Sequence, residues 1–417
     1  MAAAGGLPHR SEGRRRAAFV LVTFFAILGL LGLGPVRPAA AVSPVPGDNP
    51  SVASEVLAPG VEHQTLRDDQ SFQTVHVVRL ATGLAGRLLP VLANDVLTGP
   101  SSGVEPTSSM CTRVGCVAAV NGDYSDPGGT SVGAMVVGGE LITTPTREHI
   151  LLGIDGQGRP SMHFRFDWSV GVASADGETV PVTAVNRPLS GEGIALYSRR
   201  WGPSTGTDAA ATEVRLSLPT SAGGLPSGRT PVAVGPAEVG GGTLIPAGHV
   251  VLSGRGAGAS ALTALSQRAG GAGVLTTDVG GLVSAIGGSP QLLQNGHLAY
   301  PTDKPDSFTQ ERHPRTVVGI TAAGETLLVT ADGRGDSLGL TLLEAAQLLA
   351  RLGAVHAVNL DGGGSTTFVI GGSVRNRPSG GWERPVVSAL AVVAGAEPDP
   401  LAARPARDPL GPCDMVP

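Results

Sequence analysis

The sequence is poor in lysine, in aromatic side chains and in charge. Lys304 is the only lysine, aromatic residues make up 3% of the 417 residues and charged residues 15%, and the formal net charge is −5. A surface that binds DNA or RNA needs clustered basic side chains to neutralise phosphates, and the sequence has no such stripe. The composition therefore argues against nucleic acid as a partner and against a nuclease.

Cysteine is equally scarce, with three in the chain. Cys111 and Cys116 lie just before an apolar run, and in an oxidising compartment they are expected to form a disulfide that closes a small loop. A zinc pair is the alternative, but no neighbouring cluster of cysteine or histidine completes four ligands. Cys413 lies in a tail rich in Pro, Ala and Arg and is expected to be a free thiol.

Long apolar runs are absent except at the N-terminus. Basic residues at Arg10 and 14–16 precede an apolar run over 17–33, and the small residues Ala39-Ala40-Ala41 follow it. This order is typical of a secretory signal peptide that is cleaved near Ala41. An uncleaved membrane anchor is the alternative. Either way, the sequence predicts a secreted or extracytoplasmic protein, with membrane contact only if the anchor stays.

Glycine and proline are abundant, with 62 and 33 residues, which indicates many turns. We expect a signal peptide over 1–41, a linker over 42–60, a catalytic body over 61–398 and a disordered tail over 399–417. The length is compatible with one large domain or two. Short β-branched runs bounded by Gly, Pro or Asp recur along the body and predict a β-rich protein.

One helix is expected after Thr341, in the segment TLLEAAQLLARLG. Thr341 and Glu344 form a capping-box pattern, and Gly353 supplies a left-handed exit. Apolar strands before and after the helix predict a strand-helix-strand unit over 326–361, with a right-handed crossover and a parallel pair of strands. The expected fold is mixed α/β (α+β) and β-rich, with mixed sheets and a site at the C-terminal ends of these strands.

The second of these strands ends on Asp361 and breaks into the glycines 362–364, then Ser365 and Thr366. Consecutive glycines let backbone N–H groups converge on an anion. A carboxylate would repel a stored anion, so Asp361 is interpreted as an acid, a base, a nucleophile or an acceptor for a sugar hydroxyl. The alternative is a tight turn capped by Asp. It is not a Walker loop, because Gly-Lys-Ser/Thr is missing.

Further polar residues accompany other strands. They include His313 and Arg315 before a strand; Asp332, Arg334 and Asp336 after one; Asn121, Gly122 and Asp123 after another; and Asn376, Trp382 and Arg384 in a late loop. Arginine suits bidentate phosphate recognition, histidine titrates near neutral pH, and tryptophan stacks on sugar rings. Turn formation, surface decoration and loop packing are the structural alternatives.

Taken in order, the segments VNGDYSD, AIGGSPQLLQNG, HPRTVVGI, LLVTADGRGD, NLDGGGST and RNRPSGGWERPV resemble the phosphodiester glycosidase family. The resemblance covers 118–129 and 285–392, and each segment alone would be weak. It implies a mixed α/β catalytic domain that hydrolyses a glycosyl phosphodiester. The functional positions that it implies are Asn121, Arg315, Asp332, Arg334, Asp361, Gly362, Gly363, Gly364, Ser365 and Asn376.

The sequence thus favours an exported hydrolase acting on a sugar-1-phosphate diester, in a cell-envelope or capsular glycopolymer. Arg315 and Arg334 would hold the phosphate with the glycine turn, Asp361 and Asp332 would handle the sugar and the proton, and His313 would assist. Gly122, Asp123, Thr366 and Arg384 complete the expected substrate-binding set. The alternative is a non-catalytic carbohydrate- or phosphate-binding protein.

The sequence leaves two points of the chemistry open. Either the anomeric C–O bond or the P–O bond could break. No cofactor is certain, although Asp332, Asp336 and Asp361 could hold a divalent cation such as Ca2+ through their oxygens.

Overall fold

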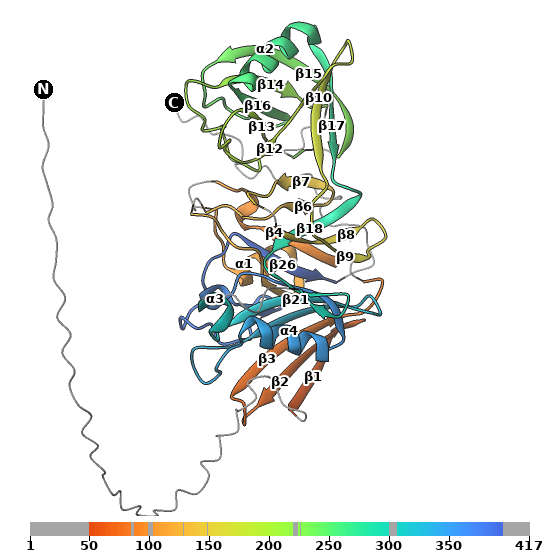
Figure 1. The fold of residues 1–417 in the computed structure, drawn as a ribbon, viewed down its shortest axis with the longest axis vertical. Helices are drawn as coiled ribbons and strands as arrows, with labels where there is room; N and C mark the ends of the chain where they lie inside the picture. Colours follow the sequence, from red (N-terminus) through yellow and green to blue (C-terminus); the bar gives the residue numbers. More distant parts are fainter. Residues whose placement is uncertain are drawn as a thin grey trace, which may run out of the picture. The chain divides into compact units, whose positions relative to one another are not determined.

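The computed structural model describes residues 50–394, except 85–86, 99–102, 128, 148, 220–223, 226 and 300–306 (Figure 1). Within Val42–Pro417, the described residues form one compact unit. The predicted signal peptide, the tail and Cys413 lie outside the described residues. Among the described residues, no helix is long and apolar enough to cross a membrane.

An eight-stranded sheet carries the strand ends of interest. Its order is β1 (Ser51–Ala58), β2 (Val61–Asp68), β3 (Gln73–Leu80), β22 (Thr326–Ala331), β21 (Arg315–Thr321), β23 (Ala354–Asn359), β19 (Gln291–Gln294) and β20 (His297–Leu298). All neighbouring pairs in it are antiparallel. The linker expected over 42–60 is therefore wrong from residue 51 onward, because β1 pairs with β2.

The strand-helix-strand unit is present in order, but its predicted parallel pair is wrong. β22 is followed by α4 (Leu342–Arg351) and then β23, and β21 lies between the two strands and is antiparallel to both. β22 and β23 consequently run in the same direction without touching. Since β21 starts at the edge where they end, Arg315 lies at the same edge as Asp332 and Asp361.

Helix α4 forms as its sequence predicts. The Thr341 hydroxyl accepts from the Glu344 amide at 3.2 Å, and the Glu344 carboxylate accepts from the Thr341 amide at 2.9 Å, which completes the capping box. The apolar face of the helix includes Leu342 and Leu349, and it packs with strand residues such as Val317 and Leu327 into one core cluster. This packing holds the loop that joins β22 to the helix.

Three further sheets complete the body. A five-stranded sheet has the order β25 (Ser373–Val374), β24 (Phe368–Ile370), β5 (Cys116–Asn121), β26 (Ser388–Val393) and β4 (Leu88–Leu92). Another has the order β7 (Glu140–Thr143), β6 (Met135–Val137), β18 (Leu282–Gly288), β8 (Ile150–Asp155) and β9 (Pro160–His163). One core cluster joins both to the eight-stranded sheet, through residues such as Val120, Ile286 and Val358.

The fourth sheet has eight strands and carries its own helix, α2 (Ala257–Ala269). Its order is β11 (Thr179–Pro181), β10 (Ser169–Ser174), β17 (Ala272–Asp278), β15 (Gly228–Val239), β14 (Thr212–Ser217), β16 (His249–Arg255), β13 (Gly193–Tyr197) and β12 (Ala184–Val185). β12 and β13 are parallel, so this sheet is mixed. The β-rich character expected from the sequence is confirmed.

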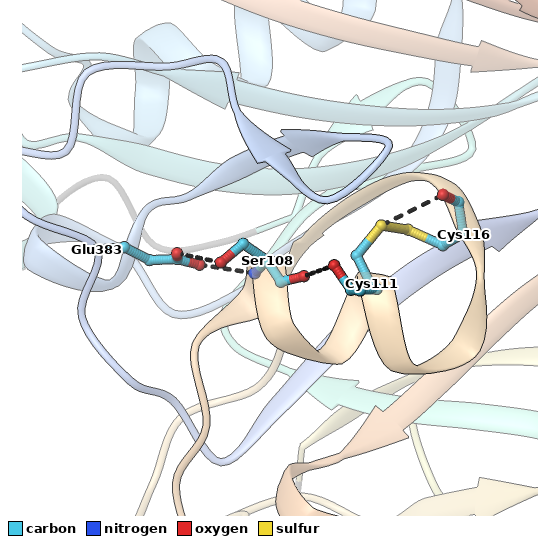
Figure 2. The surroundings of a disulfide bond; sticks show 5 residues. Ser108, Cys111, Cys116 and Glu383 are labelled. Carbon is cyan, nitrogen blue, oxygen red and sulfur yellow. Dashed lines mark hydrogen bonds between the residues drawn. A yellow bond between two sulfur atoms is a disulfide. The ribbon is translucent and has the colours of Figure 1, made fainter.

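The predicted disulfide joins Cys111 on helix α1 (Thr107–Val114) to Cys116 at the start of β5. It is consistent with an extracytoplasmic protein. Figure 2 shows the same helix held at its N-terminus, where the Ser108 amide and hydroxyl donate to the Glu383 carboxylate at 2.8 and 2.5 Å. Glu383 directly precedes Arg384, so helix α1, which the disulfide links to β5, also anchors the loop that carries this arginine.

Removing this crosslink should destabilise the protein moderately. Because the closed loop is short, with a sequence separation of 5, loop entropy predicts a loss of about 2 kcal/mol in the free energy of unfolding. Denaturant titration of the variant that combines Cys111→Ser with Cys116→Ser checks this value. Equal stability of the variant and the oxidised wild type would show that the crosslink contributes nothing.

Candidate functional site

The glycine turn after β23 is built by hydrogen bonds from three other segments. The Asp361 amide donates to Gly122 O at 3.1 Å, and the Gly363 amide donates to Pro314 O at 2.8 Å. The buried Asn121 side chain donates to Asp361 O at 2.7 Å and accepts from the Thr367 amide at 3.1 Å. Strand β5, the start of β21 and the end of β23 therefore meet at this turn.

The turn does not form the anion-binding cradle of backbone amides that its glycines suggest. The Gly362 amide donates to Asp361 Oδ1 at 2.9 Å, and the Ser365 and Thr366 amides donate to Gly362 O and Gly363 O at 3.1 and 3.3 Å. With the Gly363 amide also bonded within the protein, four of the five amides over 362–366 are occupied. The glycines must therefore serve another purpose.

Two guanidinium groups lie against the glycines of the turn, and one of them occupies the place of a Cβ atom. A Cβ atom placed on Gly363, whose φ is +61°, would lie 3.4 Å from Arg334 Nη2, and one placed on Gly364 would overlap Arg384 Nη2. Both arginines are exposed, and Arg384 Nη1 lies 3.5 Å from the Ser365 hydroxyl. The missing side chain of Gly364 thus makes room for Arg384, and Arg334 packs against Gly363, so that two positive charges lie at the turn in an arrangement suited to a phosphate.

The Asp361 carboxyl interacts electrostatically with Arg384. Burial raises its pKa above the ordinary value of 3.8, and the nearby Asp123 carboxylate adds to the rise. Hydrogen bonds from Ser365 and the Gly362 amide, together with the charge of Arg384, oppose the rise without cancelling it. A carboxyl with a raised pKa in a site that also holds guanidinium groups has the character of an acid-base or nucleophilic group.

Arg334 is itself held in an unusual conformation. Its φ is +62°, a left-handed value that is uncommon for a residue with a Cβ atom. Its Nη2 lies 2.9 Å from His313 Nδ1, so the imidazole accepts from the guanidinium. The backbone of His313 bridges to Leu340. His313 therefore orients Arg334, and in this structure its Nδ1 is used for that purpose.

Asp332 is 7% exposed and is held by the late loop. The Arg377 amide donates to its Oδ1 and Oδ2 at 3.1 and 3.2 Å, and Asn376 Nδ2 donates to Oδ1 at 3.2 Å. Burial raises the pKa of Asp332, while these bonds oppose the rise. Asn376 Nδ2 also donates to Thr366 O at 3.1 Å, so Asn376 connects Asp332 to the glycine turn.

Asn121 and its neighbours are placed differently from the substrate contacts expected of them. Asn121 is fully buried, and its Oδ1 accepts from the Thr316 hydroxyl at 2.7 Å. Gly122 packs against Ser388, where a Cβ atom would overlap the hydroxyl. Asp123 is 1% exposed and accepts from the Gly133 amide at 2.6 Å. These contacts make the three residues positioning residues for the turn.

Two residues near Asp361 were missed in the sequence. His149 Nδ1 is buried and lies 3.5 Å from Asp123 Oδ1, and it makes no hydrogen bond to any residue that the structure describes. The Tyr124 hydroxyl donates to Ser289 O at 2.9 Å and accepts from Asn359. Burial, and after it the charge of Asp361, raise the pKa of Tyr124. Tyr124 directly follows the NGD turn, which could have identified it, whereas nothing in the sequence marks His149.

Arg315 is 1% exposed, and its guanidinium is engaged with the backbone. Nε donates to Leu340 O at 2.9 Å, and one Nη donates to Phe308 O and Glu311 O at 2.5 and 3.2 Å. The guanidinium also lies over the Phe308 ring, 4.9 Å from its centroid. These contacts tie α3 (Ser307–Gln310) to the start of β21. They do not support the phosphate contact expected of Arg315.

Replacing Arg315 with lysine should consequently lower stability. A lysine keeps the charge but loses the planar set of donors, and loss of a buried hydrogen bond from a charged group costs about 1.5–3 kcal/mol in the free energy of unfolding. Urea titration of Arg315→Lys measures this difference. If the variant is as stable as the wild type but selectively loses turnover of phosphodiesters, Arg315 binds the phosphate after all.

The described residues contain no group of three or more His, Cys, Asp or Glu side chains that could hold a metal ion. Asp332, Asp336 and Asp361 therefore do not assemble into the cation site that the sequence left open. The Asp336 carboxylate instead pairs with Arg377.

The part of the chain that carries this site is similar to a known protein family. Residues 227–393 match the family model described as phosphodiester glycosidase, a range that includes His313, Asp332, Asp361 and Arg384. Over 109 residues the chain is 34% identical to N-acetylglucosamine-1-phosphodiester alpha-N-acetylglucosaminidase of Mus musculus, covering 23% of this chain and 21% of that protein. Over 65 residues it is 43% identical to the protein of the same name from Homo sapiens, covering 16% of this chain and 13% of the human protein.

The similarity therefore spans about a fifth or less of the length of these relatives. The chain is also similar to the solved structure of a hypothetical protein from Synechocystis, with a TM-score of 0.62 and 21% sequence identity. The match covers 82% of this chain and 64% of the Synechocystis chain. At that identity the likeness shows a shared fold.

Proposed function

Because this chain is related to the phosphodiester glycosidases over residues 227–393, we propose that it hydrolyses a sugar-1-phosphate diester at the glycine turn. The observation that carries the proposal is the placement of two exposed guanidinium groups, of Arg334 and Arg384, against Gly363 and Gly364, beside the carboxyl of Asp361. A phosphate diester carries one negative charge, which these two groups would bind.

The charge pattern favours cleavage of the anomeric C–O bond. When that bond breaks, the phosphate leaves as a monoester and gains a second negative charge. Two guanidinium groups on the leaving phosphate stabilise this developing charge more than they stabilise the starting diester, which is the differential binding that lowers a barrier. A phosphate leaves readily in this state, so the site has no need of a strong acid on the bridging oxygen.

Asp361 would act on the sugar side of the scissile bond. As a carboxylate it serves either as a nucleophile at the anomeric carbon or as a base that takes the proton of the attacking water. Its raised pKa makes it a better base than an ordinary aspartate. Asp332, fixed by Asn376 and the Arg377 amide, would accept hydrogen bonds from sugar hydroxyls.

The cellular setting completes the proposal. The N-terminal segment and the disulfide of Cys111 and Cys116 support an exported protein, for which a cell-envelope or capsular glycopolymer is the natural source of sugar-1-phosphate diesters. A non-catalytic envelope protein that binds carbohydrate or phosphate is the competing function. Two guanidinium groups and a carboxyl of raised pKa exceed what binding requires, which favours the enzyme.

Turnover of the methyl diester of N-acetylglucosamine 1-phosphate by purified protein tests this function. We expect release of N-acetylglucosamine, unchanged by a chelator, and poor turnover of the methyl glycoside that lacks phosphate. Binding of the diester without any turnover would favour the competing function.

A further inference from the structure

A pocket of about 610 Å³ is lined in part by the loop that carries Asp332. Its wall is formed by the end of β2, the turn after it and the start of β3, by residues 332, 333 and 335–337, and by residues 375–377. This volume falls within the range of about 300–1,000 Å³ that is usual for small-ligand sites. The chemistry proposed above uses Asp332, with Asn376 and Arg377 as its supports, and leaves the rest of the pocket wall without a role.

The rim of the pocket presents an aromatic ring in a strained conformation. Phe72 is 58% exposed and has a φ of +51°, a left-handed value that is unfavourable for a bulky residue. Two contacts hold it there: Asp68 Oδ1 accepts from the Gln70 and Ser71 amides at 2.9 and 3.2 Å, and Phe72 O accepts from the Leu338 amide at 2.9 Å. The exposure of the Phe72 ring and the strain of its backbone together indicate that the ring contacts a ligand.

The polar wall carries charges of both signs. It contains the arginines Arg67, Arg375 and Arg377 and the carboxylates Asp68, Asp69 and Asp332, among others. The buried imidazole of His76 also lines it, and burial lowers the pKa of His76 to about 4, so this ring is neutral at ordinary pH. Mixed charges give no strong attraction for an anion. They provide many hydrogen-bond donors and acceptors, which suit the hydroxyl groups of a sugar beside an aromatic ring.

The pocket adjoins the glycine turn through shared residues. Asn376 donates to Asp332 in the pocket wall and to Thr366 O at the end of the turn. Gly333 lies in the wall, while the guanidinium of the next residue, Arg334, lies against Gly363. A glycan chain bound in the pocket could therefore continue to the phosphate site.

We propose that this pocket binds the sugar units adjoining the scissile phosphodiester, with Phe72 stacking on a sugar ring and Arg67 and Arg375 bonding its hydroxyl groups. The inference rests on the proposed function and specifies its substrate as a polymer rather than a single sugar phosphate. An enzyme with such a subsite gains affinity from units beyond the bond that it cleaves.

The test compares a short and a long substrate. The short one is the methyl diester of N-acetylglucosamine 1-phosphate, and the long one is a tetramer of N-acetylglucosamine units joined by 1-phosphodiesters. Phe72→Ala and Arg375→Ala should each lower kcat/KM for the tetramer at least about tenfold, mainly through KM, and change the value for the methyl diester less than about twofold. Phe164→Ala, at a residue that is 50% exposed, and Arg229→Ala, at an exposed arginine on β15, are matched controls that should change neither.

Calorimetric titration of the tetramer separates this inference from the proposed function. Tighter binding of the tetramer than of the methyl diester, weakened by Phe72→Ala, supports the pocket even if neither compound is hydrolysed. Phe72→Gly should weaken binding in the same way and leave the thermal midpoint unchanged or higher, because glycine accepts the left-handed backbone. Equal binding of both compounds, or equal losses on both substrates in the variants, would overturn the inference.

Discussion

Replacing Asp361 with asparagine is expected to lower turnover of a sugar-1-phosphate diester at least about a hundredfold, as for a lost acid-base group, without lowering stability. Asparagine keeps the oxygen that accepts from the Gly362 amide and removes only the charge. Since burial raises the pKa of Asp361, the folded protein disfavours its ionised form. The thermal midpoint of the variant at neutral pH should therefore equal or exceed that of the wild type.

The sign of this effect predicts a dependence on pH. A raised folded-state pKa means that the contribution of Asp361 to stability is fully present below its ordinary pKa of 3.8 and is lost as pH rises through the higher folded-state value. The thermal midpoint of the wild type should thus fall relative to that of Asp361→Asn as the pH rises from 3.8 to the folded-state pKa of Asp361. At higher pH the difference between the two midpoints should stay constant. Thermal unfolding of both proteins in a pH series measures the difference.

A matched control is Asp278→Asn. Asp278 also follows the pattern of a turn aspartate, with its Oδ1 accepting from the Gly280 amide at 2.8 Å, but it lies exposed at the end of β17 in the fourth sheet. Its replacement should leave turnover unchanged. Near-normal turnover in Asp361→Asn, with a normal thermal midpoint, would mean that Asp361 is only a structural cap.

Replacing Gly364 with alanine is expected to lower kcat/KM for phosphodiesters about tenfold to a hundredfold while the protein stays folded. The new Cβ atom would overlap Arg384 Nη2, which is the far end of a flexible and exposed side chain. The guanidinium would swing away, and the phosphate would lose a charge-assisted hydrogen bond of about 1.5–3 kcal/mol. Arg384→Ala should show a similar loss, and combining the two changes should add little.

Gly191→Ala serves as the control for this variant, because a Cβ atom there meets no atom within 4 Å. Steady-state kinetics on the methyl diester and thermal unfolding give the two readouts. Should Gly364→Ala retain full activity, Arg384 does not bind the phosphate from the position seen in this structure.

Local sequence rules predict the elements whose determinants lie within a few residues. The helix α4 is capped by Thr341 and Glu344, which are three positions apart, and the structure confirms it. The disulfide spans five positions and is confirmed as well. Such features depend on near neighbours, so a single sequence contains the information that they need.

Features that depend on pairing between distant segments were not predictable in this way. The insertion of β21 between β22 and β23 replaces the expected parallel pair, because antiparallel neighbours satisfy the same apolar pattern. The segment that contains β1 is rich in Pro and Ala and lacks periodicity, which predicts a linker, and the side chains of the strand are in fact largely exposed. Its antiparallel pairing with β2 holds it in the sheet.

The candidate site shows the same division. The sequence identifies Asp361 as a carboxylate at the end of a strand. It does not show why glycine follows at position 364, because Gly364 and Arg384 are 20 positions apart and come into contact only in the fold. Arg315 lies beside a conspicuous histidine and proline, yet its guanidinium is turned to the backbone carbonyls of Leu340 and Phe308. Residue type identifies chemical capacity, whereas burial decides whether a ligand can use it.

Hydrolysis in water enriched in heavy oxygen tests the central claim most directly. With the methyl diester of N-acetylglucosamine 1-phosphate as substrate, cleavage of the anomeric C–O bond at the glycine turn predicts that mass spectrometry finds the label in the released N-acetylglucosamine and none in methyl phosphate. Label in the phosphate product would contradict the account, because it would place the attack at phosphorus rather than at the sugar.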